Sequence, residues 1–464
     1  MTLACGMPGI PGIPRATAWA QPAGEERLED VMARTRAAYQ ALLDEVQPAA
    51  GDDALPLVVK AAAEIRVWNE RAQKAGGVEA DFEALLRESA TPAQRETARR
   101  AIADLEAAGV GDMIARAAEA PRAMPTLAPG LLLETKMPHM GDLRLLTRLN
   151  VGRAMLAVDA RDNEAFVARV DEMLRLGVHA SRQGPLIAAL VGYAIQARAF
   201  EVVRRAILAD VLDDGTISRL DALIDERDVA PLTHVLRAEQ ILAEDATEYV
   251  YFAGSEGVAV LGRENTDEPL PPVRRRMVPD GTALGKGMPD RATQLRVTRE
   301  AHNLLRQAAE LCPADPMFTR HLARARAITE TNLLLEMLTP GIDRAIRGVR
   351  QFESEREGVR TLLAIARHTR ATGAPPLSLD ELVPAYLPVV PLDPYTGKRL
   401  GYLPPPKGPY EGGRRFVLYS AGWDGRDDGG KVDFAEPFRS QRPGAAGLDF
   451  LLNRETPRKE LSPR

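Results

Sequence analysis

Hydrophobic residues recur at helical spacing through most of the first 370 residues. Near the start, Leu28, Val31 and Met32 stand three and four residues apart, which places them on one face of a helix. Pairs of aspartates and glycines punctuate this pattern, and Thr91-Pro92 is typical of a helix start because proline is tolerated at the first helical position. We therefore expect residues 25–120 to form a helical region.

The most regular pattern lies between residues 142 and 250. Asp142 precedes an apolar helical run and is expected to cap it, and a turn is expected at Arg161-Asp162-Asn163. The next helix is expected to end at Gly177, because glycine is favoured just beyond a helix C-terminus. Further helices are expected at 185–208, 216–225 and 229–243. This succession predicts an array of helical hairpins, although the 34-residue signature of tetratricopeptide repeats is absent.

Changes in composition mark the remaining boundaries. Segment 121–138 holds four prolines and is expected to be a connector, and helices are expected again at 293–311, 316–338 and 340–372. The chain therefore predicts a mainly α protein in which a helical-hairpin array is followed by a long helix and a small α+β cap. The expected parts are a leader (1–24), a helical region (25–120), a helical-hairpin domain (142–250), a linker (254–292), helices (293–372), a small β unit (373–436) and a flexible tail (437–464). Within the tail, a short apolar contact is expected at Leu448 to Leu452.

Bulk composition narrows the choice of partners. The 464 residues include 45% hydrophobic and 27% charged residues, which is typical of a globular protein. The net charge of −5 and the low aromatic content of 5% give no reason to expect nucleic acid binding. The longest apolar run, Leu186 to Ile195, is too short to cross a bilayer and is interpreted as a buried helix. We expect a protein partner and no transmembrane helix.

The N-terminus carries two patterns of exported proteins. Ala18-Trp19-Ala20 fits the small-x-small pattern of a signal-peptidase site. Leu3-Ala4-Cys5 is similar to the end of a lipoprotein signal, in which Cys5 would carry a lipid anchor if the true start lay upstream. The alternative is a disordered, alanine-rich leader. We expect an extracytoplasmic location, in the periplasm or cell envelope.

The strongest chemical lead lies near the C-terminus. The run Phe416 to Ser420 is typical of a strand and is expected to pair with a strand near Leu400 to Leu403. It leads into a glycine-rich loop with four carboxylates, which repel one another unless a cation or solvent relieves them. Calcium prefers such hard oxygen ligands, but the spacing is not that of an EF-hand. The alternative is a solvated turn held by Asx-type hydrogen bonds. The loop carboxylates are Asp424, Asp427, Asp428 and Asp433.

These residues also carry a resemblance. The motifs Leu379-Asp-Glu-Leu, Asp393-Pro-Tyr-Thr-Gly and Tyr419-Ser-Ala-Gly-Trp-Asp-Gly, followed by Gly429-Gly430, resemble the globular domain of the major pseudopilin of type II secretion systems. The resemblance covers about residues 340–436. The prepilin motif and membrane helix of that family are absent from this sequence. The whole chain also looks like an exported helical protein family of planctomycete-type bacteria whose function is unassigned.

The resemblance implies a calcium site in the loop. Pseudopilins bind calcium through aspartates and backbone carbonyls, and Asp424, the carbonyl of Ala421 and Asp433 match those positions. Ser420 stands where the family keeps a hydroxyl. The segment before Asp433 is shorter than in typical pseudopilins, so Asp427 or Asp428 is an alternative ligand.

Three functions remain open. The leading hypothesis is a non-enzymatic, exported scaffold associated with the envelope or with secretion, with a calcium-binding loop. The second is a helical-repeat module that binds a peptide or protein, which an apolar groove between the hairpins would favour. A hydrolase that uses two carboxylates is the third, and the known catalytic motifs of hydrolases and nucleotide-binding enzymes are absent.

Overall fold

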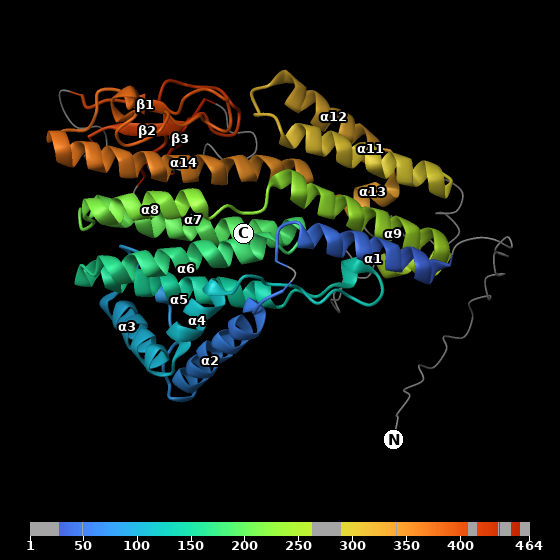
Figure 1. The fold of residues 1–464 in the computed structure, drawn as a ribbon, viewed down its shortest axis with the longest axis horizontal. Helices are drawn as coiled ribbons and strands as arrows, with labels where there is room; N and C mark the ends of the chain where they lie inside the picture. Colours follow the sequence, from blue (N-terminus) through green and yellow to red (C-terminus); the bar gives the residue numbers. More distant parts are fainter. Residues whose placement is uncertain are drawn as a thin grey trace.

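A computed structural model describes residues 27–48, 50–261, 289–339, 341–406, 415–434, 436 and 447–454. Helices dominate, and a three-stranded sheet lies near the C-terminus, which confirms the mainly α class (Figure 1). Within these ranges no sheet strand precedes Gly401. The predicted leader with Cys5, most of the predicted linker and part of the predicted tail lie outside the described residues.

The N-terminal region follows the predicted helix signals. The elements are α1 (Leu28–Asp44), α2 (Ala54–Lys74), η1 (Phe82–Leu85), α3 (Pro92–Ala107) and α4 (Val110–Glu119). Thr91 and Gln94 form a reciprocal capping box at the start of α3. This region does not pack as one unit, because Tyr39 and Leu42 of α1 lie against Leu242 of α9, whereas α2 and α4 pack against α5 and α6.

The hairpin region contains α5 (His139–Ala160), α6 (Asn163–Ser181), α7 (Leu186–Leu208), α8 (Asp214–Glu226) and α9 (Leu232–Leu261). The predicted turn after α5 is confirmed, and Arg161 there has a positive φ of 56°. The prediction that Asp142 caps a helix is wrong. Helix α5 begins before it, and the buried Asp142 carboxylate forms an ion pair with Arg66 of α2.

Gly177 does not end α6, and the structure gives the reason for a glycine there. A Cβ at Gly177 would meet the backbone oxygen of Gly192 at 2.9 Å, and a Cβ at Gly192 would meet the Gly177 oxygen at 2.5 Å. Both residues lie inside their helices, α6 and α7. The two glycines therefore allow the helix backbones to approach closely, a role that the sequence pattern did not separate from a helix end.

The later helices differ from prediction at two places. Helix α9 continues to Leu261, beyond the predicted start of the linker at 254, and residues 262–288 lie outside the described part. The predicted helix 316–338 is two helices, because the Asn332 side chain accepts a hydrogen bond from the Leu335 N–H and caps a new one. The elements are α11 (Arg291–Ala309), α12 (Pro316–Glu330), α13 (Leu333–Leu338) and α14 (Ile342–Thr372).

The C-terminal unit contains a short 3-10 helix, η3 (Leu379–Leu382), and a small sheet that follows it in the chain. Strands β1 (Gly401–Leu403), β2 (Val417–Ser420) and β3 (Phe450–Leu451) are antiparallel and lie in the order β1-β2-β3. The predicted pairing is confirmed, with Tyr402 opposite Leu418. The apolar contact expected at Leu448 to Leu452 is present, because Phe450 and Leu451 are buried and complete the sheet as β3.

The molecule is layered around α14. The sheet unit lies on one side of this helix and α7 and α8 on the other, followed by α6, α5 and helices α2 to α4, while α1 lies beside α9 (Figure 1). Leu362 and Ile365 of α14 face the sheet unit, and Phe352 stacks on Tyr193 and Phe200 of α7. Helix α7 is the one described helix long and apolar enough to cross a membrane, and 61% of its apolar window is buried inside the fold.

Candidate functional site

Hydrogen bonds from its own backbone and from neighbouring segments hold the predicted acidic loop. Asp424 accepts hydrogen bonds from the N–H groups of Arg426 (3.0 Å) and Gly447 (3.3 Å). Asp427 accepts one from the Gly429 N–H (2.9 Å) and one from the Tyr419 hydroxyl (3.2 Å). The bonds from the Arg426 and Gly429 N–H groups, each two residues beyond its aspartate, are typical of Asx turns, the structural alternative to a metal site.

The remaining predicted ligands point to other partners. Asp433 accepts a hydrogen bond from the Glu436 N–H (2.9 Å). Ser420 donates to one Asp393 oxygen (2.7 Å), and the N–H of Ala421 donates to the other (2.9 Å). Asp393 is 3% exposed, and its burial raises the pKa of its carboxyl. The structure thus ties Ser420 and Ala421 to Asp393, whose motif was recognised but which was not predicted as a site residue.

Asp449 is the second carboxylate that sequence reasoning missed. It is buried, and its two oxygens accept hydrogen bonds from the N–H groups of Asp428 (3.1 Å) and Gly430 (2.8 Å). Burial raises the pKa of Asp449 to about 6, and the nearby charges of Asp427 and Asp428 add to the rise. It lies in the short stretch of the tail where only an apolar contact was expected, so no local signal linked it to the loop.

The loop therefore brings together part of the predicted set. Asp427 and Asp428 lie near Asp449, whereas Asp424 and Asp433 each hold a different turn. Across the described ranges, no group of three or more His, Cys, Asp or Glu side chains is arranged to hold a metal ion. Calcium binding in this loop stays a prediction.

An aromatic contact attaches the loop to the helical body. The guanidinium of Arg347 on α14 lies over the rings of Phe318 (4.8 Å) and Trp423 (5.4 Å), and donates a hydrogen bond to the Trp423 carbonyl (3.1 Å). Cation–π contacts of this kind are favourable when the cation is partly desolvated. Trp423 is thus a natural reporter of how the loop sits on the body.

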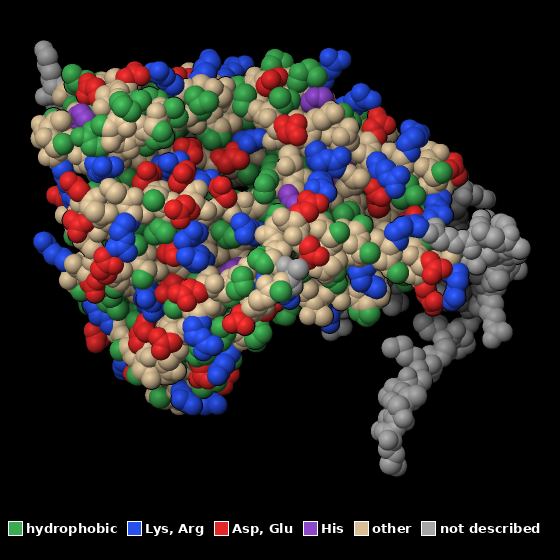
Figure 2. All heavy atoms as spheres, viewed as in Figure 1, with side chains coloured by type: hydrophobic (Ala, Val, Ile, Leu, Met, Phe, Trp, Pro, Cys, Tyr) green, Lys and Arg blue, Asp and Glu red, His purple; other side chains and the backbone are tan. Residues whose placement is uncertain are grey.

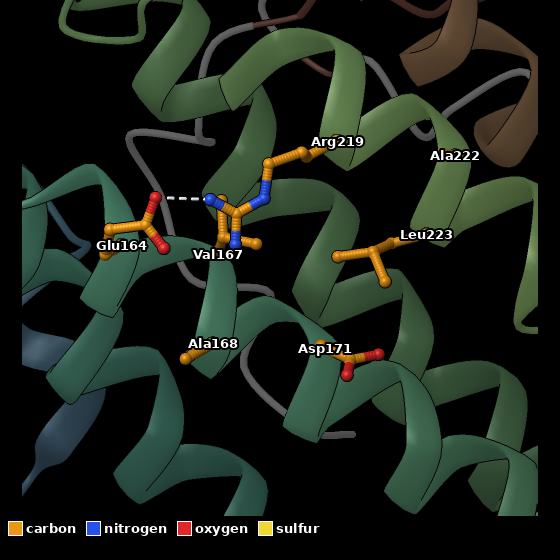
Figure 3. Close-up of a pocket in the computed structure, with 7 residues that line it drawn as sticks. All are labelled: Glu164, Val167, Ala168, Asp171, Arg219, Ala222 and Leu223. Atoms are coloured by element: carbon orange, nitrogen blue, oxygen red, sulfur yellow. Dashed lines mark hydrogen bonds and ion pairs between the residues drawn. The ribbon is translucent and has the colours of Figure 1, made fainter. Parts of the chain in front are cut away.

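Two open grooves lie in the helical body. The first, which we call the hairpin groove, runs between α6 and α8 and has a volume of about 410 Å³ (Figure 3). Its apolar residues are Val167, Ala168, Ala222 and Leu223. Its charged residues are Glu164, which forms an ion pair with Arg219, and Asp171, which pairs with Arg175 and Arg227.

The second groove, which we call the α14 groove, has a volume of about 490 Å³. It is formed by α14, α7, the end of α1, the α6–α7 turn and the α8–α9 loop. Tyr193 and Phe352 lie in its floor with ring centroids 4.9 Å apart. Elsewhere on the surface, acidic and basic side chains are interspersed on the face in Figure 2, with no large region of one sign there.

The fold and grooves define a mainly helical protein with a small C-terminal sheet unit and open, mixed-character surfaces. Comparison with known proteins adds no relative to this description: no protein-family model matches the chain, and no curated protein or solved structure was found to be similar to it.

Proposed function

We propose that this protein is a non-enzymatic, exported scaffold whose helical hairpins bind a segment of a partner protein in the hairpin groove. The observation that carries the proposal is the groove itself. It lies between two hairpin helices, has an apolar centre at Val167 and Leu223, and has charged residues around that centre. This is the arrangement of a protein-binding surface, where an apolar core is surrounded by a polar rim.

The charges of the groove support binding more than catalysis. Glu164 is in an ion pair with Arg219, and Asp171 with Arg175 and Arg227. A hydrolase that uses two carboxylates needs them to face the substrate, whereas both carboxylates of this groove face arginine partners.

A substitution that fills the groove tests the proposal. Ala222 is exposed and lines the groove, so Ala222→Trp should block a partner segment without disturbing the core. Ala103→Trp, at an exposed position inside α3, is the matched control. In pull-downs from envelope fractions, we expect a partner captured by the native protein and by Ala103→Trp to be lost with Ala222→Trp. A partner set that is the same for all three proteins would contradict the proposal.

Export is part of the proposal and has its own test. It rests on Ala18-Trp19-Ala20 and on the pseudopilin-like motifs of the C-terminal unit. Cell fractionation and N-terminal sequencing should find the protein in the periplasm or envelope with its leader shortened. A full-length protein confined to the cytosol would contradict it.

Calcium binding by the C-terminal loop is a second candidate, favoured by one observation. Asp449 is buried beside Asp427 and Asp428, and this crowding helps raise its pKa to about 6. A cation would relieve the repulsion, and a ligand that prefers the folded form raises the melting temperature. We expect millimolar calcium to raise the melting temperature of the unit, and Asp427→Asn, beside Asp449, to reduce the rise. If calcium does not shift the melting temperature, the loop is only an acidic turn.

A further inference from the structure

The α14 groove has an apolar floor, and its rim carries one arginine beyond those that pair with its acidic residues. The floor is built from buried side chains, among them Tyr193, Phe352 and Val349. The two rings stack with an interplanar angle of 25°, and the Tyr193 hydroxyl donates to the Ala230 carbonyl (3.4 Å). A flat apolar floor next to polar groups is typical of sites that hold one large side chain.

Each acidic residue at the rim already has an arginine partner. Glu45 accepts two hydrogen bonds from Arg237 (2.6 and 2.9 Å). Asp228 forms an ion pair with Arg356 (2.6 Å), and Glu353 pairs with Arg350 (2.6 Å). The negative charges of the rim are therefore balanced before Arg182 is counted.

Arg182 is the remaining cation of this groove. Its guanidinium donates to the Asp228 backbone carbonyl (3.3 Å), and within the described part of the chain it forms no ion pair with a carboxylate. Asp228, the nearest acid, is engaged by Arg356. A half-buried guanidinium with this environment is suited to a carboxylate, which it can bind with two parallel hydrogen bonds.

We propose that the α14 groove binds a partner protein segment in which an aromatic residue stands next to an acidic residue. The aromatic side chain would lie on Tyr193 and Phe352, and the acidic carboxylate would pair with Arg182. Charge complementarity selects this occupant, because the groove offers one cation beyond its own ion pairs beside an aromatic floor. The site uses other residues than the hairpin groove, so it stands or falls independently of the function proposed above.

The experiment uses short peptides that differ by one group. The probes are acetyl-Gly-Phe-Asp-Gly-amide, its Asn counterpart and its Ala-Asp counterpart, titrated into the full chain and followed by calorimetry. The Phe-Asp peptide should bind with a dissociation constant of about 1 mM or tighter. The Asn peptide should bind about ten-fold more weakly, because a hydrogen-bonded charge is lost. The Ala-Asp peptide should lose most of the binding.

Variants assign the effect to this groove. Arg182→Gln should remove the difference between the Asp and Asn peptides, and Arg182→Lys should keep part of it. Arg326→Gln, at an exposed arginine of α12 that lines neither groove, is the matched control and should bind like the native protein. Circular dichroism checks that each variant is folded. The proposal is overturned if the Asp and Asn peptides bind equally, if Arg182→Gln keeps the difference, or if binding is absent up to about 10 mM. Occupation of the groove by a second copy of the chain, seen as self-association that Arg182→Gln abolishes, would also overturn it.

Discussion

Two buried carboxylates, Asp393 and Asp449, organise the C-terminal unit at the level of single residues. Each accepts backbone N–H groups from a segment distant in the sequence: Asp393 holds the end of β2, and Asp449 holds the acidic loop. Buried carboxylates are costly unless such donors satisfy them. Both also fix loop residues that were expected to bind calcium, so any cation would have to fit a backbone that these residues already constrain.

Asp449 should make the stability of this unit depend on pH. Its pKa is raised from 3.8 to about 6 in the folded protein, so the folded state binds this proton more tightly than the unfolded chain. The stabilisation is therefore complete below the unfolded pKa and is lost as the pH rises through about 6. In the presence of a chelator, the unit should melt at a higher temperature near pH 5 than near pH 8 as far as this residue contributes.

A substitution separates this effect from other titrating groups. Asp428→Asn removes a nearby negative charge from an exposed side chain and should lower the pKa of Asp449, which reduces the pH dependence. Asp380→Asn, exposed in the same unit, is the control. Trp423 fluorescence follows the loop once Trp19 and Trp68 are replaced by Phe. Equal pH profiles for Asp428→Asn and the control would show that carboxylate crowding is unimportant.

At the scale of elements, helix α14 contains two glycines with different surroundings. A Cβ added at Gly348 would meet nothing within 4 Å, whereas one added at Gly358 would meet Leu452 side-chain atoms at 3.0 and 3.1 Å. Glycine inside a helix costs about 1 kcal/mol relative to alanine. The cost at Gly358 is offset by the close approach of the C-terminal segment.

The two glycines give a matched pair of substitutions. Gly348→Ala should raise the free energy of unfolding by up to about 1 kcal/mol. Gly358→Ala should gain less or lose stability, because Leu452 must move. In a Leu452→Ala background, which removes the two Cδ contacts at 3.1 Å but keeps the Cβ contact at 3.0 Å, the difference between Gly358→Ala and Gly348→Ala should become smaller. Chemical denaturation measures each value, and an equal gain at both positions in the native background would contradict this account.

Local sequence patterns predicted the helices and strands better than they predicted the contacts between them. The capping box at Thr91 and the turn at Arg161 were predictable because the residues involved are neighbours in the chain. The pairing of β1 with β2 followed from two short runs of strand-forming residues. The roles of Gly177 and Asp449 were not predictable, because each depends on a partner segment that the sequence does not place nearby. The two grooves were not predictable for the same reason, because each is lined by residues from separate helices.

For the whole molecule, a buried ionic cluster joins the sheet unit to the helical body. Glu355 of α14 pairs with Arg454 from the C-terminal segment (2.6 Å) and with Arg204 of α7 (3.5 Å). All three residues are at most 5% exposed. Although burial opposes it, Arg454 and Arg204 hold the pKa of Glu355 below its ordinary value. Burial and the like charge of Arg454 lower the pKa of Arg204 to about 10.

The charges of this cluster predict which of two substitutions lowers the free energy of unfolding more. Arg454→Met leaves Glu355 paired with Arg204, so a neutral buried pair remains. Glu355→Gln removes the carboxylate that lies between the two buried guanidinium groups, which should cost about 3 kcal/mol or more. The loss for Glu355→Gln should therefore exceed the loss for Arg454→Met.

The same variants test whether the C-terminal unit and the body unfold together. With Trp19 and Trp68 replaced by Phe and the cluster intact, denaturation followed by Trp423 fluorescence and by helical circular dichroism should give coincident transitions, because the cluster and the Arg347 contact link the two parts. In Glu355→Gln the fluorescence transition should move to lower denaturant than the helical one, since the link to the C-terminal segment is weakened first. A larger loss for Arg454→Met than for Glu355→Gln would mean that this segment is held by the apolar contacts of Phe450 and Leu452 rather than by charge.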